Sequence, residues 1–440
     1  MEHRQFKLAA LALAGLMAAA PLAAEKDAND IQDSMEDLRA SLGTLAGQVN
    51  NLQAANDKAL VWNVNTDLRY DYAPYKVFGA GTAAQPLALP YGAPNGYTGM
   101  YAKRVELEAT GKIATDLYFN LQFDFAGLKI EDTGFDYKNL SLLPFVAMPG
   151  YNWEVKVGLY RQPFGIENQT GSSSIPFPER AIMDGGYNPA GYAKIVTERV
   201  MGVQFITSHN FGMIGYKLQA AVADNTSDQD PGSSVTTGSY GAGNPSLGLN
   251  VDQDPSEFGR FGLDLNFNPK VVTLNLGGSA LHNSANTVFF ATTGATENWS
   301  DNYGADFTLN VPIANDVVWG EWVMQDKFNN NGAGTPAAAG NLVSHAEGWY
   351  ITNSLKPLAF FNADWTNLEL NARIEQFAPN VNANYAAFAV NSEQAATIGL
   401  KYFYAGKSYT SVNYTSYALN GDYSAIGASS LFSVQQQFNY

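Results

Sequence analysis

The chain of 440 residues contains no cysteine. This absence excludes disulfides, thiolate zinc sites, iron–sulfur clusters and covalently attached c-type haem. We expect no cofactor and no metal. Charge is also scarce, because only 15% of the residues are charged, against roughly 25% in an average soluble domain. The net charge is −16. Nucleic acid is therefore not an expected partner, since binding its phosphates requires a basic face.

Long apolar runs are missing as well. A membrane helix needs ~20 consecutive apolar residues, and no such run follows the first two dozen residues. This pattern excludes a helical membrane protein. Yet 46% of the chain is hydrophobic and 13% is aromatic. Abundant aromatic residues without a membrane helix predict apolar surface that is distributed one residue at a time along β-strands.

The first 24 residues have the pattern of a secretory signal. Arg4 and Lys7 precede an apolar run over residues 8–20, and small residues follow. A basic start, a short apolar centre and a small-residue end are typical of an exported chain. We expect residues 1–24 to be a signal peptide, and a buried N-terminal helix is the alternative.

Residues 25–60 carry a heptad repeat. Apolar side chains recur alternately four and three residues apart from Ile31 to Ala59, and Asn56 takes one of these positions. This spacing predicts a coiled coil in which the asparagine fixes the register. A single amphipathic helix packed against its own chain is the alternative.

From residue 61 onward the period is two. Between Leu117 and Phe125 every second residue is apolar, and the alternate residues are Tyr118, Asn120, Gln122 and Asp124. Such strands suit a half-buried sandwich or a membrane barrel. About sixteen such strands are expected, and fourteen or eighteen are also compatible. Their predicted centres are Leu68, Val105, Leu121, Ser141, Val155, Val203, Leu218, Leu263, Leu274, Phe307, Trp322, Ile351, Leu370, Ile398, Tyr414 and Val434.

Connection lengths decide between the two folds. Long connections such as residues 224–256 alternate with short turns, predicted at Ser208–Asn210, Asn268–Lys270, Ile313–Asn315 and Ala405–Lys407. Long loops at one rim and tight turns at the other are typical of a transmembrane antiparallel β-barrel. We therefore predict an all-β fold, with the barrel over residues 61–440. An even strand number places both barrel ends at the tight-turn rim, with the coiled coil directed to the periplasm.

Two stretches resemble a known family. The chain ends in alternating aromatic and apolar residues up to Tyr440, as bacterial outer-membrane proteins do, and residues 157–167 read VGLYRQPFGIE, followed by Phe-Pro-Glu-Arg at 177–180. This combination resembles the phosphate-selective porin O and P family. The resemblance implies a trimeric porin in the outer membrane of a Gram-negative bacterium.

The family-like stretch lies in the third long loop, about residues 162–191, which in trimeric general porins folds inward and narrows the pore. Pro163 and Gly165 turn the chain off the strand end, and charged residues follow. An alternative is that Glu179 and Arg180 pair and pin the loop to the wall. The expected constriction residues are Arg161, Glu167, Glu179, Arg180 and Asp184.

The alternation also places charged residues of both signs on the lumen face. Phosphate selectivity, which the family name implies, requires a ladder of basic groups. Because carboxylates share the face, as at Asp67, Glu108 and Glu375, we expect neutralised pairs and a weakly selective or cation-preferring pore. The expected pore-lining residues are Arg69, Arg104, Glu106, Arg260, Asp264, Glu369 and Arg373.

The leading hypothesis is a porin for passive diffusion of ions and small hydrophilic solutes. The alternative is a structural or interaction barrel that tethers the cell wall or surrounds a separate partner protein. An enzyme is not expected, because no nucleophile motif such as Gly-x-Ser-x-Gly occurs. Asp-Gln-Asp-Pro recurs at 228–231 and 252–255, but a full calcium loop is missing. Expected partners are a second and third copy of the chain, outer-membrane lipid and lipopolysaccharide, and peptidoglycan or another periplasmic protein through the coiled coil.

Overall fold

The computed structural model describes residues 60–73, 97–114, 116–126, 129–138, 151–171, 174–184, 195, 199–223, 256–283, 300–326, 345–362, 365–378, 392–405, 408–420 and 429–439. The predicted signal peptide, the heptad repeat up to Ala59 and both Asp-Gln-Asp-Pro sequences lie outside these residues. Leu60–Tyr440 forms one compact unit. No helix among the described residues is long and apolar enough to cross a membrane.

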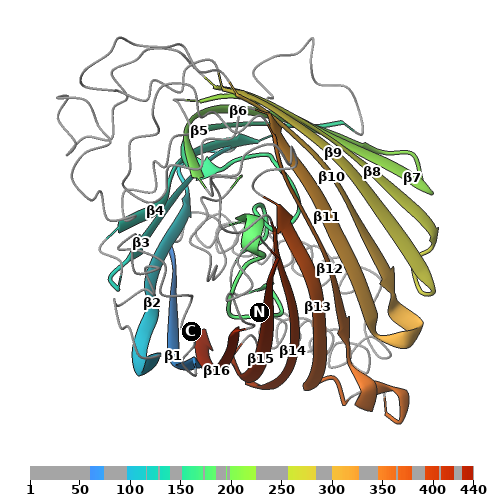
Figure 1. The fold of residues 1–440 in the computed structure, drawn as a ribbon. Coiled ribbons are helices and arrows are strands. Elements are labelled where there is room, and N and C mark those ends of the chain that lie inside the picture. Colours follow the sequence, from blue (N-terminus) through green and yellow to red (C-terminus); the bar gives the residue numbers. More distant parts are fainter. Residues whose placement is uncertain are drawn as a thin grey trace, which may run out of the picture. The chain divides into compact units, whose positions relative to one another are not determined.

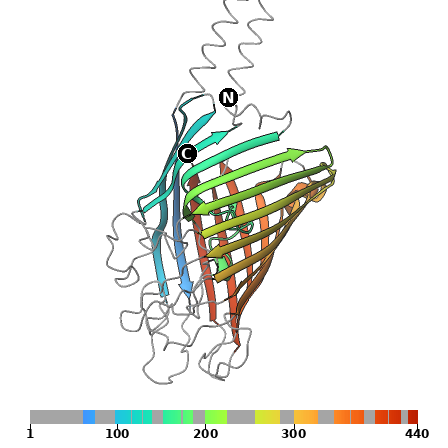
Figure 2. The ribbon, with the colours of Figure 1, turned by 90° about the horizontal axis from the view of Figure 1, so that it is seen from above.

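The described strands form one closed antiparallel barrel of 16 strands, in which each strand pairs with its sequence neighbours and β1 pairs with β16 (Figures 1 and 2). This confirms the predicted fold class and strand number. The strands are β1 (Val61–Ala73), β2 (Tyr97–Lys112), β3 (Leu117–Asp124), β4 (Lys129–Lys138), β5 (Tyr151–Arg161), β6 (Arg199–Asn210), β7 (Ile214–Ala223), β8 (Ser256–Asn268), β9 (Val272–Asn283), β10 (Ser300–Val311), β11 (Asp316–Asp326), β12 (His345–Leu355), β13 (Leu368–Ala378), β14 (Ser392–Ala405), β15 (Ser408–Asn420) and β16 (Ser429–Asn439).

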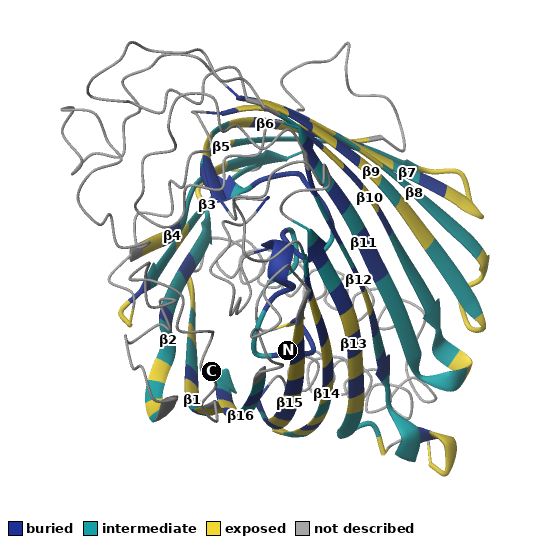
Figure 3. Ribbon diagram, viewed as in Figure 1, coloured by how far each residue is buried: buried dark blue, intermediate teal, exposed yellow. Residues whose placement is uncertain are grey.

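Alternate residues of a strand face opposite sides of the barrel wall. In β1, Asp67, Arg69 and Asp71 are buried, whereas Leu68 and Tyr72 are 40% and 45% exposed. The alternation of buried and exposed positions is visible on the strands of Figure 3. Because a polar group in lipid costs several kcal/mol when it is unsatisfied, the apolar outward residues meet the membrane and the polar residues face the lumen.

Most short connections lie at one rim. They include the turns at 211–213 and 269–271 and the 3-10 helix η5 (Pro312–Ala314). The connections 139–150 and 356–367 at this rim are longer, and the connection 125–128 at the opposite rim is short. The connections at the opposite rim include residues 162–198, 224–255 and 327–344. A further short helix, η6 (Pro357–Phe360), joins β12 to β13. The predicted placement of long connections at one rim is therefore confirmed for the β5–β6 and β7–β8 connections.

Two local predictions were wrong. The fourth strand is not centred at Ser141 but runs from Lys129 to Lys138, and Ser208–Asn210 is the end of β6 rather than a turn. The first part of β4 reads KIEDTG, where polar residues at successive positions obscure the period of two. The strand was instead predicted in the apolar residues that follow residue 139.

A bulge in β2 changes which side chains face inward. Asp67 pairs with Arg104 and Leu68 pairs with Ala102, so Lys103 has no residue opposite it. An extra residue of this kind redirects its side chain. Lys103 consequently reaches Pro178 and Glu179 inside the barrel, although strict alternation would place it outside.

Candidate pore constriction

Residues 162–184 leave the end of β5 and contact the inner wall on distant strands. Figure 1 shows this green segment, with the 3-10 helix η3 (Ile182–Asp184), inside the ring of strands. We call residues 162–184 the lumen segment. It begins with a sharp turn at Gly165, where φ is +63°, a conformation that glycine adopts without steric cost.

Glu321 on β11 binds the backbone of this turn. Its Oε2 accepts hydrogen bonds from the N–H groups of Ile166 and Glu167 at 3.1 and 3.3 Å, and from the hydroxyl of Tyr350 at 3.1 Å. A Cβ at Gly165 would overlap the Glu321 carboxylate. The glycine is therefore required both by its φ and by the closeness of this carboxylate.

Arg373 on β13 is the main wall anchor. Its guanidinium donates to the backbone oxygens of Glu179 and Arg180, both at 3.1 Å. It also pairs with Glu375 at 3.1 Å and with Glu167 at 3.4 Å. The planar fork of arginine is suited to such simultaneous contacts. A side chain predicted to line the pore is thus 4% exposed and binds the lumen segment.

Glu375 extends the anchor on the same strand. Its Oε2 accepts the backbone N–H of Ile182 at 2.7 Å. On β14, Lys401 donates to the backbone oxygen of Ile175 at 2.9 Å. The segment is therefore bound at its start, middle and end by charged groups of β11, β13 and β14.

Glu179 binds the segment to β1 and β2, which lie beyond the seam where β1 pairs with β16. It forms ion pairs with Arg69 on β1 and, at 3.2 Å, with Lys103 on β2. Burial would raise the pKa of Glu179, but the adjacent Arg69 and Lys103 outweigh it and lower the pKa to about 2. Asp71 supports Arg69 from β1 at 2.6 Å. The negative charge of Glu179 therefore holds the lumen segment to the wall through its ion pairs with Arg69 and Lys103.

Arg180 turns back onto the segment itself. It donates to the backbone oxygens of Glu167 and, at 3.0 Å, of Thr170. Glu167 in turn accepts the N–H of Ala181 at 2.7 Å. Arg161, at the end of β5, donates to the backbone oxygens of Asn168 and Thr170 at 3.3 and 3.0 Å. These bonds hold the segment in one compact conformation.

Asp184 ends η3 and is 6% exposed. Its two carboxylate oxygens accept no hydrogen bond from the described residues. Burial, Glu321 and Glu167 together raise the pKa of Asp184 well above its usual value. The cause is that a second negative charge is unfavourable in a buried position beside Glu321.

An apolar core lies between the segment and the wall. Phe164, Ile182 and Met183 pack in one cluster with wall residues such as Val323 and Phe377, and Phe164 and Phe377 are 0% exposed. Burying such side chains stabilises the docked position by roughly 1.5–3 kcal/mol each. The inner face is thus apolar beneath the segment, whereas simple alternation predicts a polar inner face throughout.

The remaining predicted lumen residues lie on the wall. Arg104 is 3.8 Å from Glu106, which also accepts from Asn65 at 2.8 Å. Arg260 forms an ion pair with Asp306 and donates to Ser279 at 2.9 Å. Asp264 is half-buried on β8, and Glu369 pairs in register with Lys401. These residues are distributed around the ring. Of the predicted pore-lining residues, Arg69 and Arg373 bind the described part of the lumen segment.

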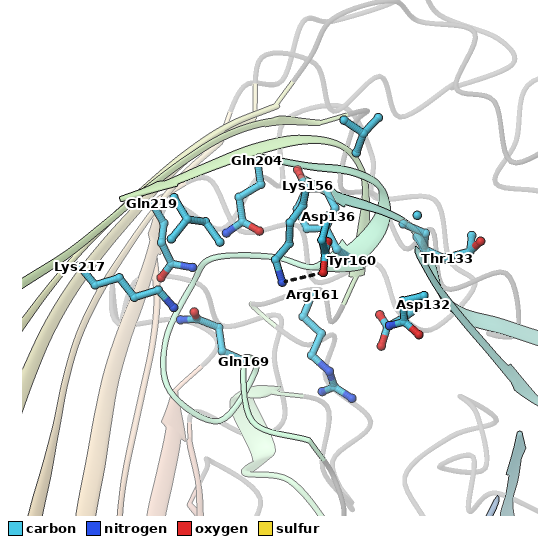
Figure 4. Close-up of a pocket in the computed structure, with 15 residues that line it drawn as sticks. Asp132, Thr133, Asp136, Lys156, Tyr160, Arg161, Gln169, Gln204, Lys217 and Gln219 are labelled. Atoms are coloured by element: carbon cyan, nitrogen blue, oxygen red, sulfur yellow. Dashed lines mark ion pairs between the residues drawn. The ribbon is translucent and has the colours of Figure 1, made fainter. Parts of the chain in front are cut away.

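A polar cavity of about 240 Å³ remains on the other side of the segment. Its wall is formed by β3, β4, β5, β6 and β7, and Gln169 contributes from the segment (Figure 4). Lys156 and Asp136 face each other across 4.0 Å within it. The lumen therefore has an apolar, filled side and a polar, hollow side.

Sequence reasoning missed several residues that hold the segment. Lys103 is hidden by the bulge. Glu321 shares its inward face with Trp319 and Val323, so the period of β11 is obscured. The signal available in the sequence is the isolated charge of Glu321 within an otherwise apolar strand, because a buried charge requires partners.

A closed barrel with a polar lumen, an apolar outer face and an inward segment defines an outer-membrane channel protein. Residues 90–440 match the family model described as phosphate-selective porin O and P, and the chain belongs to this family. As a member of this family, it forms a channel for passive diffusion in the outer membrane of a Gram-negative bacterium. No curated protein matches the chain.

Solved structures share the fold. The outer membrane channel DcaP of Acinetobacter baumannii is 12% identical, with a TM-score of 0.53 over 88% of this chain and 98% of that chain. OprB of Pseudomonas putida is 8% identical, with a TM-score of 0.54 over 89% and 96% of the two chains. At these identities the similarity concerns the barrel alone.

Proposed function

We propose that the lumen segment is the constriction of the channel, and that the pore is weakly selective or prefers cations. The constriction residues are Arg161, Glu167, Glu179, Arg180 and Asp184. The observation that supports this best is that the segment leaves the wall at the end of β5 and is bound by Arg373 on β13, which lies across the closed ring from β5, and by Arg69 on β1. A segment held at both sides narrows the path for every solute.

The ion preference follows from how the lumen arginines are paired. Arg69, Arg260 and Arg373 each form an ion pair with a carboxylate. A paired arginine contributes little net field to a passing ion. The whole chain carries a net charge of −16. The balance of charges therefore favours small cations and neutral hydrophilic solutes over multivalent anions.

Planar-bilayer recording tests this proposal. We expect purified protein to give stable conductance steps, and a reversal potential in a KCl gradient with the sign of weak cation preference. A closed barrel would contradict the channel, and a clear anion preference would contradict the charge argument. The channel is further proposed to have no catalytic activity, which assays against ester and peptide substrates would test.

We also propose that the chain assembles as a homotrimer through the heptads between Ile31 and Ala59. Apolar residues at alternate spacings of three and four need a partner helix to be buried. Residues 1–24 would be removed on export, and the coiled coil would then extend into the periplasm, where peptidoglycan or another protein is within its reach. Lipid and lipopolysaccharide would surround the barrel.

Native mass spectrometry of the mature protein checks assembly and export together. The expected result is a trimer whose chains begin near residue 25. A monomer, or chains that begin at Met1, would contradict the corresponding part of the proposal. Loss of the trimer on deletion of residues 31–59 would assign assembly to the heptads.

A further inference from the structure

The polar cavity beside the lumen segment contains three glutamines from three different elements. Gln169 lies on the segment, Gln204 on β6 and Gln219 on β7 (Figure 4). Gln204 and Gln219 are only 3% and 7% exposed, yet their side chains form no hydrogen bond with any described residue. Buried amides are normally bonded. An amide can both donate and accept, which is what a hydroxyl group requires.

Lys217 adds a positive charge that forms no ion pair with the described residues. It lies on the inward face of β7 between Gly215 and Gln219 and is exposed. Figure 4 shows its ammonium group directed toward Gln169. Lys217 therefore presents an ammonium group beside Gln169, whose amide donates to the backbone oxygen of Gly165 at 2.5 Å, and in the same cavity as the unbonded amides of Gln204 and Gln219.

The other charged side chains of the cavity have partners. Arg161 donates to the backbone oxygens of Asn168 and Thr170. Lys156 lies 3.5 Å from Glu154 and 4.0 Å from Asp136. Asp132 pairs with Arg199 at 3.0 Å. The described lining thus contains three cationic side chains, Lys156, Arg161 and Lys217, and two carboxylates, Asp132 and Asp136, which leaves a surplus of one positive charge. The two carboxylates remain close to any ligand.

We propose that this cavity is a binding site for a small monocarboxylate that carries hydroxyl groups. The carboxylate pairs with Lys217, and the hydroxyls bond to Gln169, Gln204 and Gln219. A phosphate dianion fits poorly, because Asp132 and Asp136 line the same cavity and the described lining has a surplus of just one positive charge. A neutral polyol leaves the ammonium of Lys217 without a counter-charge.

The size of the cavity agrees with a small solute. Its volume of about 240 Å³ is just below the roughly 300–1,000 Å³ of pockets that hold drug-sized ligands. Because the cavity lies beside the lumen segment, a bound solute would occupy the hollow side of the lumen. The inference rests on the proposed channel function, and it names a solute class for that channel.

Gluconate, sorbitol and inorganic phosphate are suitable probes, because gluconate and sorbitol differ mainly in the carboxylate. We expect gluconate to block the KCl current of single channels in a saturable manner, and sorbitol and phosphate to require at least about tenfold higher concentrations. Lys217→Gln should weaken the gluconate block about tenfold, and Lys217→Arg should retain most of it. Lys270→Gln is the matched control, because Lys270 is an exposed turn residue that does not line the cavity.

Titration calorimetry of gluconate into detergent-solubilised protein gives a second measurement that does not depend on conduction. Binding that is lost in Lys217→Gln supports the site even if the barrel does not conduct, and that combination would contradict only the channel. Equal binding of phosphate or sorbitol, undiminished binding in Lys217→Gln, or no gluconate binding by a conducting channel overturns the site.

Discussion

Gly165 of the lumen segment lies directly against the carboxylate of Glu321, with its φ at +63°. Gly165→Ala would force the carboxylate away and break its bonds to the N–H groups of Ile166 and Glu167. We expect larger, noisier single-channel currents and a loss of about 1–3 kcal/mol in folding free energy, the cost of unsatisfied buried groups. Bilayer recording and denaturant unfolding measure the two effects.

Gly212 provides the matched control. Its φ is +88°, but a Cβ there would meet no heavy atom of the described residues within 4 Å. Gly212→Ala therefore introduces the strain of a positive φ but no overlap with a neighbouring side chain, so the single-channel current should be unchanged. Altered currents in both variants would contradict a specific contact between Gly165 and Glu321.

Arg373 forms two hydrogen bonds and one ion pair with the lumen segment. Arg373→Met should leave Glu167 and Glu375 without their cation at a cost of about 3–5 kcal/mol, as for other broken buried pairs. We expect an increased and fluctuating conductance because the segment undocks. Arg373→Lys keeps the charge but loses the fork, so its conductance should be intermediate. A wild-type current in Arg373→Met would show that the segment stays docked without this residue.

Acid should release the segment through Glu179. The docked pKa is about 2, against an ordinary value of 4.5. Because the docked pKa is lowered, the stabilisation is complete above 4.5 and is lost as the pH falls toward 2. Current noise recorded across this window should rise in the wild type. Glu179→Gln lacks the titrating group, so an identical acid transition in this variant would contradict the assignment.

Selectivity depends on the pairing of arginines with carboxylates. Asp306→Asn leaves Arg260 without its ion pair and adds positive field to the lumen. The reversal potential in a KCl gradient should therefore shift toward anion preference. Glu257→Gln removes one charge from an exposed outward position of β8 and should cause no shift. Equal shifts in both variants would indicate an effect of total charge rather than of the lumen.

The barrel could be predicted from the sequence because alternation is a local property. Residues Leu117–Phe125 and the strand around Asp67 carry the period of two that lipid on one side and polar groups on the other impose. The failure at β4 has the same origin. Polar residues at successive positions there remove the local signal, although pairing with β3 and β5 still forms the strand.

The anchoring of the segment could be predicted only in part. The turn at Pro163 and Gly165 and the charges at Glu167 and Glu179 are visible in the sequence. Their partners are not, because Arg373 is 194 residues from Glu179 and Lys103 faces inward only through a bulge. Such contacts depend on which distant strands the closed barrel places opposite each other.

We expect solutes to pass along the hollow side of the lumen, past Gln169. The natural absence of cysteine allows one thiol to be introduced at a time. A charged thiol reagent should lower the single-channel conductance of Gln169→Cys stepwise and leave Leu68→Cys unchanged, because Leu68 faces outward from β1. An unchanged conductance in Gln169→Cys, with labelling verified by mass spectrometry, would contradict the account.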